Sequence, residues 1–163
     1  MRNALTVCGI LLLFLSSCYS FKGISIPADT SSYYVSVFTV RASGAPADIG
    51  QVFSQELIDK IRNESRLSLQ ETDPDITFEG EVVKYEVTAI NPEPNAQVAN
   101  NRLTIDVKVQ YTPKRENEGW NQTFTYFVDF PANRTLFEVQ DQIIDEAFAQ
   151  ITEDIFNKAF TDW

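Results

Sequence analysis

Histidine is absent from this chain of 163 residues. Its absence removes the commonest general base, the commonest transition-metal ligand and the usual partner of a serine nucleophile. Cysteine is almost as scarce, because Cys8 and Cys18 are the only two and both stand near the N-terminus. The rest of the chain therefore has no thiol for a disulfide, a metal site or nucleophilic catalysis. We expect no metal, no cofactor and no enzymatic activity, and stability has to come from packing.

Positive charge is also in short supply. The chain has 13 Lys and Arg against 23 Asp and Glu, which gives a net charge of −10. No run of basic residues offsets this balance locally. A domain with this charge repels nucleic acid and anionic membrane surfaces as a whole. We therefore expect no nucleic-acid partner.

The chain has one sizeable hydrophobic run, residues 7–15 (VCGILLLFL), which follows Arg2. The run is well below the ~20 residues of a membrane-spanning helix. A cation, a short apolar stretch and small residues in this order are typical of an export signal. An ordinary secretory signal would end in a small-x-small motif, whereas here Leu15, Ser16 and Ser17 lead to Cys18. This arrangement resembles the lipobox of bacterial lipoproteins.

The lipobox resemblance implies that residues 1–17 are a signal peptide and that Cys18 is lipidated after cleavage. The attached chains, palmitate among them, would hold the N-terminus firmly in a membrane leaflet. Residues 18–30 then form a short lipidated tether and residues 31–163 a single domain. Tyr19 after the cysteine, and the lack of an acidic cluster in residues 20–26, favour the outer membrane with the domain facing the periplasm.

Two segments have helical periodicity. Asp48 with Gln51 three residues later predicts a capping box and a helix ending near residue 63. Thr135 with Glu138 predicts a second capping box and a long C-terminal helix. The apolar stripe of this second helix consists of Leu136, Val139, Ile143, Ile144, Ala147, Phe148, Ile151, Ile155 and Ala159.

Four segments are predicted to be strands: 33–40, 76–90, 102–111 and 120–130. The 76–90 segment changes the parity of its apolar residues partway, which predicts a β-bulge near Gly80. The last two segments alternate cleanly and should form an antiparallel hairpin.

The expected fold is α+β, with elements in the order β-α-β-β-β-α. Two apolar helix stripes and four one-sided strands bury their apolar surfaces together when both helices cover the same sheet face. The result is a two-layer α/β sandwich with a mixed, mostly antiparallel four-stranded sheet. Parallel pairing is possible only across the first helix.

This order and four segments resemble the LptE-like family of outer-membrane lipoproteins that assist lipopolysaccharide transport. The segments are 19–27 (YSFKGISIP), 78–82 (FEGEV), 101–105 (NRLTI) and 153–159 (EDIFNKA). The resemblance implies an α/β sandwich that plugs an LptD-like β-barrel and assists its assembly. It also implies lipopolysaccharide as a partner. With so acidic a chain, direct binding requires that basic side chains gather in space; the candidates are Arg41, Lys84, Arg102, Lys108 and Arg134.

Candidate contacts with a partner lie mainly on the two hairpin strands. Phe127 is an apolar residue at a position where the alternation of its strand predicts a polar, solvent-facing side chain, so we expect it to be exposed. The solvent-facing positions of the preceding strand include Arg102, Thr104, Lys108 and Gln110, and a polar barrel wall could contact them there. The irregular segment 91–100 is a second candidate contact surface.

Two other functions remain open. A stand-alone periplasmic lipoprotein could bind a glycan or lipid through its aromatic residues, although most of those fit core positions. A hydrolase would need a carboxylate pair. The pairs available are Asp73 with Asp75, Glu79 with Glu81, and Asp141 with Asp145.

Overall fold

The computed structural model describes residues 25–90, 99–114 and 119–161. The expected signal peptide, Cys18 and most of the 91–100 segment lie outside the described residues. The elements are β1 (Ser32–Val35), β2 (Thr39–Val40), α2 (Ile49–Glu64), β3 (Ser68–Leu69), β4 (Ile76–Ile90), β5 (Asn100–Pro113), β6 (Trp120–Pro131) and α3 (Leu136–Phe160). No helix among these residues is long and apolar enough to cross a membrane.

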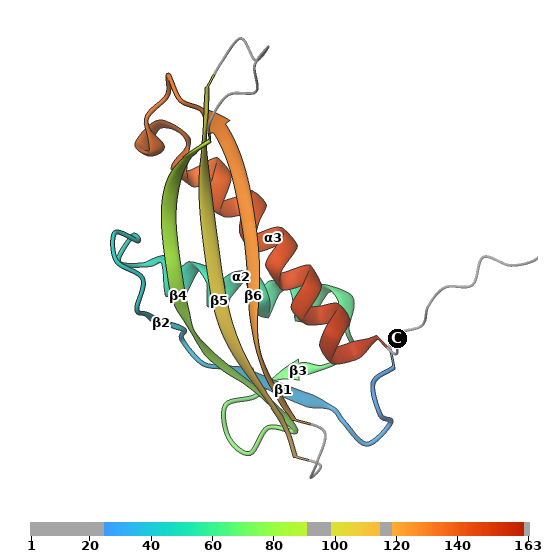
Figure 1. The fold of residues 1–163 in the computed structure, drawn as a ribbon. Helices are drawn as coiled ribbons and strands as arrows, with labels where there is room; N and C mark the ends of the chain where they lie inside the picture. The colour runs from blue at the N-terminus through green and yellow to red at the C-terminus, as the bar shows by residue number, and fades with distance from the viewer. Residues whose placement is uncertain (1–24, 91–98, 115–118, 162–163) are drawn as a thin grey trace, which may run out of the picture.

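The molecule has two layers, a twisted sheet and two helices on one of its faces (Figure 1). The strand order is β3-β1-β4-β5-β6, and β2 also pairs with β4. β1 and β2 run parallel to β4, whereas β4, β5 and β6 are antiparallel neighbours. The predicted α+β sandwich is confirmed, and each parallel pair among the described strands joins a strand before α2 to one after it, as expected.

The sheet has six strands where the pattern predicted four, because β3 is an addition and the first predicted strand is divided. Strict alternation would turn Val37 inward, yet Val37 is 67% exposed and Phe38 is 2% exposed. The backbone turns here so that Phe38 enters the core, and this separates β1 from β2. The buried Ser54 hydroxyl accepts a hydrogen bond from the Phe38 N–H at 2.9 Å and lies 3.1 Å from the Ser36 carbonyl oxygen.

Two glycines leave room for Phe38. A Cβ atom on Gly80 would stand 2.6 Å from the Phe38 ring, and one on Gly50 would stand 2.0 Å from the Phe38 carbonyl oxygen. Both distances are shorter than any tolerable contact. Phe38, Gly50, Ser54 and Gly80 therefore form one packing unit, the Phe38 pocket, which joins β4, α2 and the β1–β2 connection.

The predicted bulge in β4 is confirmed, and it lies slightly C-terminal to Gly80. The register with β5 shifts between Val82 and Lys84. Val82 and Tyr85 are both buried although they are three residues apart. The extra residue, Val83, is partly exposed, so the bulge moves the inward parity by one position.

The two predicted capping boxes differ. The Asp48 box is wrong: Asp48 precedes α2 in a helical conformation (φ −96°, ψ −2°), and its side chain makes no capping hydrogen bond. An N-cap side chain normally reaches the helix from extended backbone. The Thr135 box is confirmed, since the Glu138 carboxylate accepts hydrogen bonds from the Thr135 N–H at 2.7 Å and hydroxyl at 3.0 Å. These bonds lower the pKa of Glu138.

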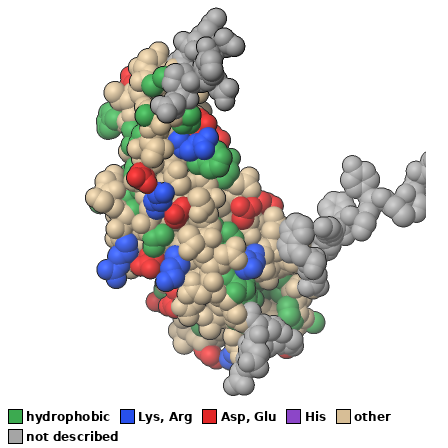
Figure 2. Space-filling view, in the orientation of Figure 1, with side chains coloured by type: hydrophobic (Ala, Val, Ile, Leu, Met, Phe, Trp, Pro, Cys, Tyr) green, Lys and Arg blue, Asp and Glu red, His purple; other side chains and the backbone are tan. Residues whose placement is uncertain are grey.

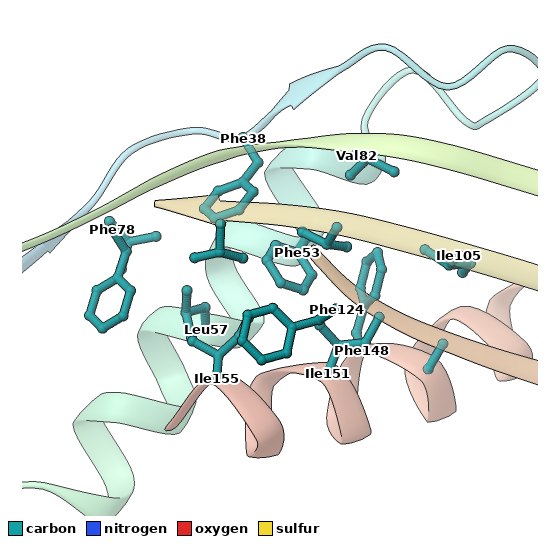
Figure 3. Packing of buried hydrophobic residues seen from close by; sticks show 14 of the residues in the cluster. Phe38, Phe53, Leu57, Phe78, Val82, Ile105, Phe124, Phe148, Ile151 and Ile155 are labelled. Atoms are coloured by element: carbon teal, nitrogen blue, oxygen red, sulfur yellow. The ribbon is translucent and has the colours of Figure 1, made fainter. Parts of the chain in front are cut away.

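The core lies between the sheet and the helices, and aromatic rings join its parts. Phe53 of α2 makes edge contacts at 4.9 Å with Phe38 on one side and with Phe148 of α3 on the other. Figure 3 shows these three rings between the sheet and α3, with Leu57 and Ile151 close by. Phe53 and Phe148 are fully buried. This row of rings ties the helix layer to the divided edge of the sheet.

The last residues of the expected tether pack on the folded domain. The Ser25 N–H donates to the Phe160 carbonyl at 2.7 Å, which fixes this segment beside the end of α3. Arg66 donates to the carbonyl oxygens of Pro27 at 2.6 Å and Thr30 at 3.0 Å. The chain therefore joins the domain at the lower end of the sheet in Figure 1.

Candidate functional site on the open face of the sheet

The sheet surface opposite the helices, here called the open face, carries the solvent-facing side chains of β4, β5 and β6. On β5 the inward residues Leu103, Ile105, Val107 and Val109 are all buried, so the residues between them point outward. Strand register places the outward residues in rows. The rows are Glu79–Gln110–Asn121, Glu81–Lys108–Thr123, Lys84–Asp106–Thr125, Glu86–Thr104–Phe127 and Thr88–Arg102–Asp129.

All five candidate contact residues from the sequence lie on this face. Phe127, Thr104 and Arg102 occupy two adjacent rows, and Phe127 is 51% exposed as expected. Lys108 and Gln110 lie further along β5, beside a shallow hollow of about 190 Å³ that Glu79, Glu81 and Asn121 also line. The face thus offers one exposed aromatic ring and, at some distance from it, one polar hollow.

Arg102 holds the exposed ring in place. Its guanidinium makes two hydrogen bonds to the Asp129 carboxylate, at 2.7 and 2.9 Å. The same guanidinium lies 3.9 Å from the centre of the Phe127 ring, in cation–π geometry. The hydrogen bonds lower the pKa of Asp129 and raise that of Arg102, so both groups stay charged over the physiological pH range. Arg102, Phe127 and Asp129 form one interacting unit, the Arg102 clamp.

The basic side chains of the face are neutralised locally. Glu81 lies 3.4 Å from Arg41 and 3.8 Å from Lys108, and Lys84 lies 3.1 Å from Glu86. Figure 2 shows basic and acidic side chains interspersed on this side of the molecule.

Arg134, the remaining basic candidate, lies in the turn before α3 and donates to the Glu138 carbonyl at 3.1 Å. The five basic candidates therefore do not form an unpaired cationic cluster.

Asp106 lies on the solvent-facing parity of β5, as the alternation predicts, but its environment differs from that of its neighbours. Its Oδ1 atom is buried and accepts no hydrogen bond from the described residues. It lies in the central row, between Lys84 and Thr125. A buried carboxylate oxygen that accepts no hydrogen bond is energetically unfavourable. A hydrogen-bond donor supplied by a partner would therefore be stabilised at this position. In the sequence Asp106 is one of several alternating polar residues, and nothing else marks it.

The carboxylate pairs considered for catalysis serve the fold or face solvent. Asp75 Oδ2 accepts hydrogen bonds from the N–H and hydroxyl groups of Ser31 and Ser32, at 2.8 to 3.1 Å. The Ser31 backbone bond is the largest of the effects that lower the pKa of Asp75 to about 2. Asp73 pairs with Lys114 at 2.9 Å.

The other two pairs are less constrained. Glu81 is engaged by Arg41 and Lys108, and Glu79, Asp141 and Asp145 are exposed. Within the described ranges, no group of three His, Cys, Asp or Glu residues could hold a metal ion.

The fold and this surface define the chain as a small α+β domain with one sheet face covered by helices and a polar open face on which the cations are paired with carboxylates. A family model described as LptE, lipopolysaccharide-assembly, matches residues 30–159. The chain belongs to this family, a family of non-catalytic assembly lipoproteins. No curated protein matches the sequence.

Solved structures share the fold at low sequence identity. Rare lipoprotein B from Shewanella oneidensis is 14% identical, with a TM-score of 0.51 over 77% of this chain and 92% of that one. Protein XCC0632 from Xanthomonas campestris is 12% identical, with a TM-score of 0.55 over 82% and 87%. A putative neuraminyllactose-binding hemagglutinin homolog from Helicobacter pylori is 10% identical, with a TM-score of 0.55 over 86% and 89%. These similarities establish the fold alone.

Proposed function

We propose that this chain is an outer-membrane lipoprotein, lipidated at Cys18 and facing the periplasm, that partners an LptD-like β-barrel in lipopolysaccharide transport. Membership of the lipopolysaccharide-assembly family supports the general role. The observation that carries the barrel partnership is the open face. It is polar, the cations in its rows are paired with carboxylates, and it carries one exposed aromatic ring in contact with the Arg102 guanidinium.

A barrel lumen is lined by polar side chains, so a protein that sits against it needs a polar surface of its own. The rows of the open face meet that requirement, because each cation on them is already paired with a carboxylate. A partner can therefore cover these three cations without leaving any of them buried and unpaired, which would be strongly unfavourable.

The Arg102 clamp is the proposed anchor of the contact. Aromatic and Arg side chains are enriched among the residues that dominate binding energy at interfaces. Phe127 is fixed by Arg102, so little side-chain freedom is lost when a partner covers it. Thr104, beside Phe127, and Lys108 and Gln110, beside the hollow, would extend the contact along β5.

The test uses photo-crosslinking in the native envelope. A photoreactive phenylalanine analogue replaces Phe127 in the full chain, which carries a C-terminal tag. Phe137 is a matched control, since it is 88% exposed but lies on α3, away from the open face. We expect a crosslink from position 127 to a large outer-membrane barrel and a much weaker one from position 137.

A crosslink from position 137 alone would place the contact on the helix layer and contradict the assignment of the open face. Absence of any barrel from the tagged purification would contradict the partnership itself. Cys18→Ala is expected to abolish palmitate labelling, and persistent labelling would contradict lipidation at this residue.

A further inference from the structure

A pocket of about 490 Å³ lies at the end of the domain where the chain joins it. The open face and the proposed barrel contact do not involve it. Ser25 and Pro27 form one side, and the ends of β4, β5, β6 and α3 contribute the rest. Because the Ser25 N–H is bonded to the Phe160 carbonyl, this side of the pocket is held against the end of α3.

One part of the pocket combines aromatic rings with a cation. Tyr111 and Trp120 are stacked, with ring centres 5.3 Å apart and planes 14° from parallel. The Lys158 ammonium lies 5.4 Å from the Trp120 ring and makes no ion pair with a described residue. Lys114 also lines the pocket, although it pairs with Asp73. Lys158 is therefore available to an anionic group.

Another part of the pocket favours a cation. Asp75 lines it, and the hydrogen bonds from Ser31 and Ser32 keep this carboxylate ionised. These bonds all fall on Oδ2, so Oδ1 retains its capacity to accept. The C-terminal end of α3 adds the negative end of its dipole at Phe160. Aromatic faces also attract ammonium groups.

The pocket opens close to the proposed membrane anchor. Ser25 is seven positions after Cys18, and seven extended residues span at most about 25 Å. If Cys18 is lipidated, as proposed above, the pocket lies within that reach of the leaflet surface. Tyr and Trp side chains are common where a protein meets the headgroup layer of a membrane, because their rings combine an apolar body with a polar group.

We infer that this pocket binds the zwitterionic phosphoethanolamine headgroup of a membrane phospholipid. The phosphate is placed against Lys158, and the primary ammonium is placed against Asp75 and the end of α3. The placement on the membrane rests on the proposed function, whereas binding of the headgroup depends only on the residues of the pocket.

The experiment uses the full lipidated chain in a nonionic detergent. Trp163 is replaced by Phe, so that Trp120 is the single tryptophan and reports on the pocket. Short-chain (dihexanoyl) phosphatidylethanolamine is titrated while Trp120 fluorescence is followed. Matched titrations use dihexanoyl phosphatidylglycerol, which lacks the ammonium, and dihexanoyl phosphatidylcholine, which cannot donate N–H bonds to a carboxylate.

We expect a saturable change with phosphatidylethanolamine and weaker responses to the other two lipids. Lys158→Gln should weaken binding about fivefold or more, since it removes a charged hydrogen-bond donor from the phosphate. Lys84→Gln on the open face is the matched control and should leave binding unchanged. Equal responses to the three lipids, no saturable response, or equal effects of the two variants would each overturn the inference. None of these outcomes bears on the barrel crosslink, so the two proposals fail independently.

Discussion

The two faces of one sheet contrast most clearly along β5. Its inward residues Leu103, Ile105 and Val107 are buried against the helix layer, whereas Arg102 and Lys108, which flank this stretch on the opposite parity, point to solvent and pair with carboxylates. The inward face obtains its free energy from apolar burial, which is large and depends on shape. The open face contributes little to folding, since exposed ion pairs are worth at most about 1 kcal/mol. Residues on the open face are therefore free to serve a partner.

Truncating one phenylalanine in the helix layer that covers the inward face and one on the open face should give the largest difference. Phe148→Ala removes a fully buried ring that contacts Phe53, and a loss of about 3–5 kcal/mol in the free energy of unfolding is expected. Phe127→Ala removes a half-exposed ring and should cost about 1 kcal/mol or less. Urea denaturation of both variants measures the difference. Similar losses at the two positions would show that the open face is part of the core.

A second test of the inward face adds a methyl group to the core instead of removing a side chain from it. Gly80→Ala places a Cβ 2.1 Å from the Lys108 carbonyl oxygen and 2.6 Å from the Phe38 ring. Overpacking of this kind should destabilise the protein by about 1–3 kcal/mol. Gly119→Ala is the control, because the nearest atom there is 3.1 Å away and the residue is exposed. Thermal unfolding should rank the two variants in this order; a tolerated Gly80→Ala would mean that Phe38 can move without cost.

The structure explains which parts of the fold the sequence predicts well. The β5 and β6 strands, the Thr135 capping box and the β4 bulge follow from alternation or spacing within a few residues. Local patterns of this kind appear directly in the sequence.

The missed features depend on contacts between distant segments. The division of the first strand results from Phe38 packing against Gly80 and Ser54, and its one local sign is the adjacent pair Val37 and Phe38. Asp106 is distinguished by its surroundings on neighbouring strands and not by its own sequence context. The pocket near Ser25 combines five segments of the chain, so no short motif could reveal it.

Asp75, at the end of the sheet near Ser25, and Asp129, on the open face, should differ in how much each contributes to the pH dependence of stability in acid. The pKa of Asp75 is about 2 in the folded protein, against a usual value of 3.8. The stability that Asp75 contributes is therefore complete above about pH 4 and is lost as the pH falls through 2. Asp75→Asn should lower stability at neutral pH and flatten the pH dependence between pH 4 and 2.

The matched variant is Asp129→Asn on the open face, where Arg102 also lowers the pKa but both side chains are partly exposed. Its effect on the same titration should be smaller, because the Asp129 carboxylate accepts two hydrogen bonds, both from Arg102, whereas the Asp75 carboxylate accepts four from Ser31 and Ser32. Unfolding free energies measured at several pH values compare the two. An equal or larger effect of Asp129→Asn would show that the open-face ion pair is as important for folding as the Asp75 bonds.

The smallest effect on stability, and the one most specific for function, is expected at Arg102. Arg102→Lys keeps the positive charge but loses the two parallel hydrogen bonds to Asp129 and the flat contact with the Phe127 ring. Stability should change less than in the variants above, since solvent screens the exposed Arg102 side chain. Barrel capture by the tagged chain should nevertheless fall severalfold, because Phe127 is no longer held for the contact. Lys84→Arg, which alters a cation of the same face outside the Arg102 clamp, should leave capture unchanged. Equal capture by the two variants would show that the open face binds through its general polarity and that the rigid ring is dispensable.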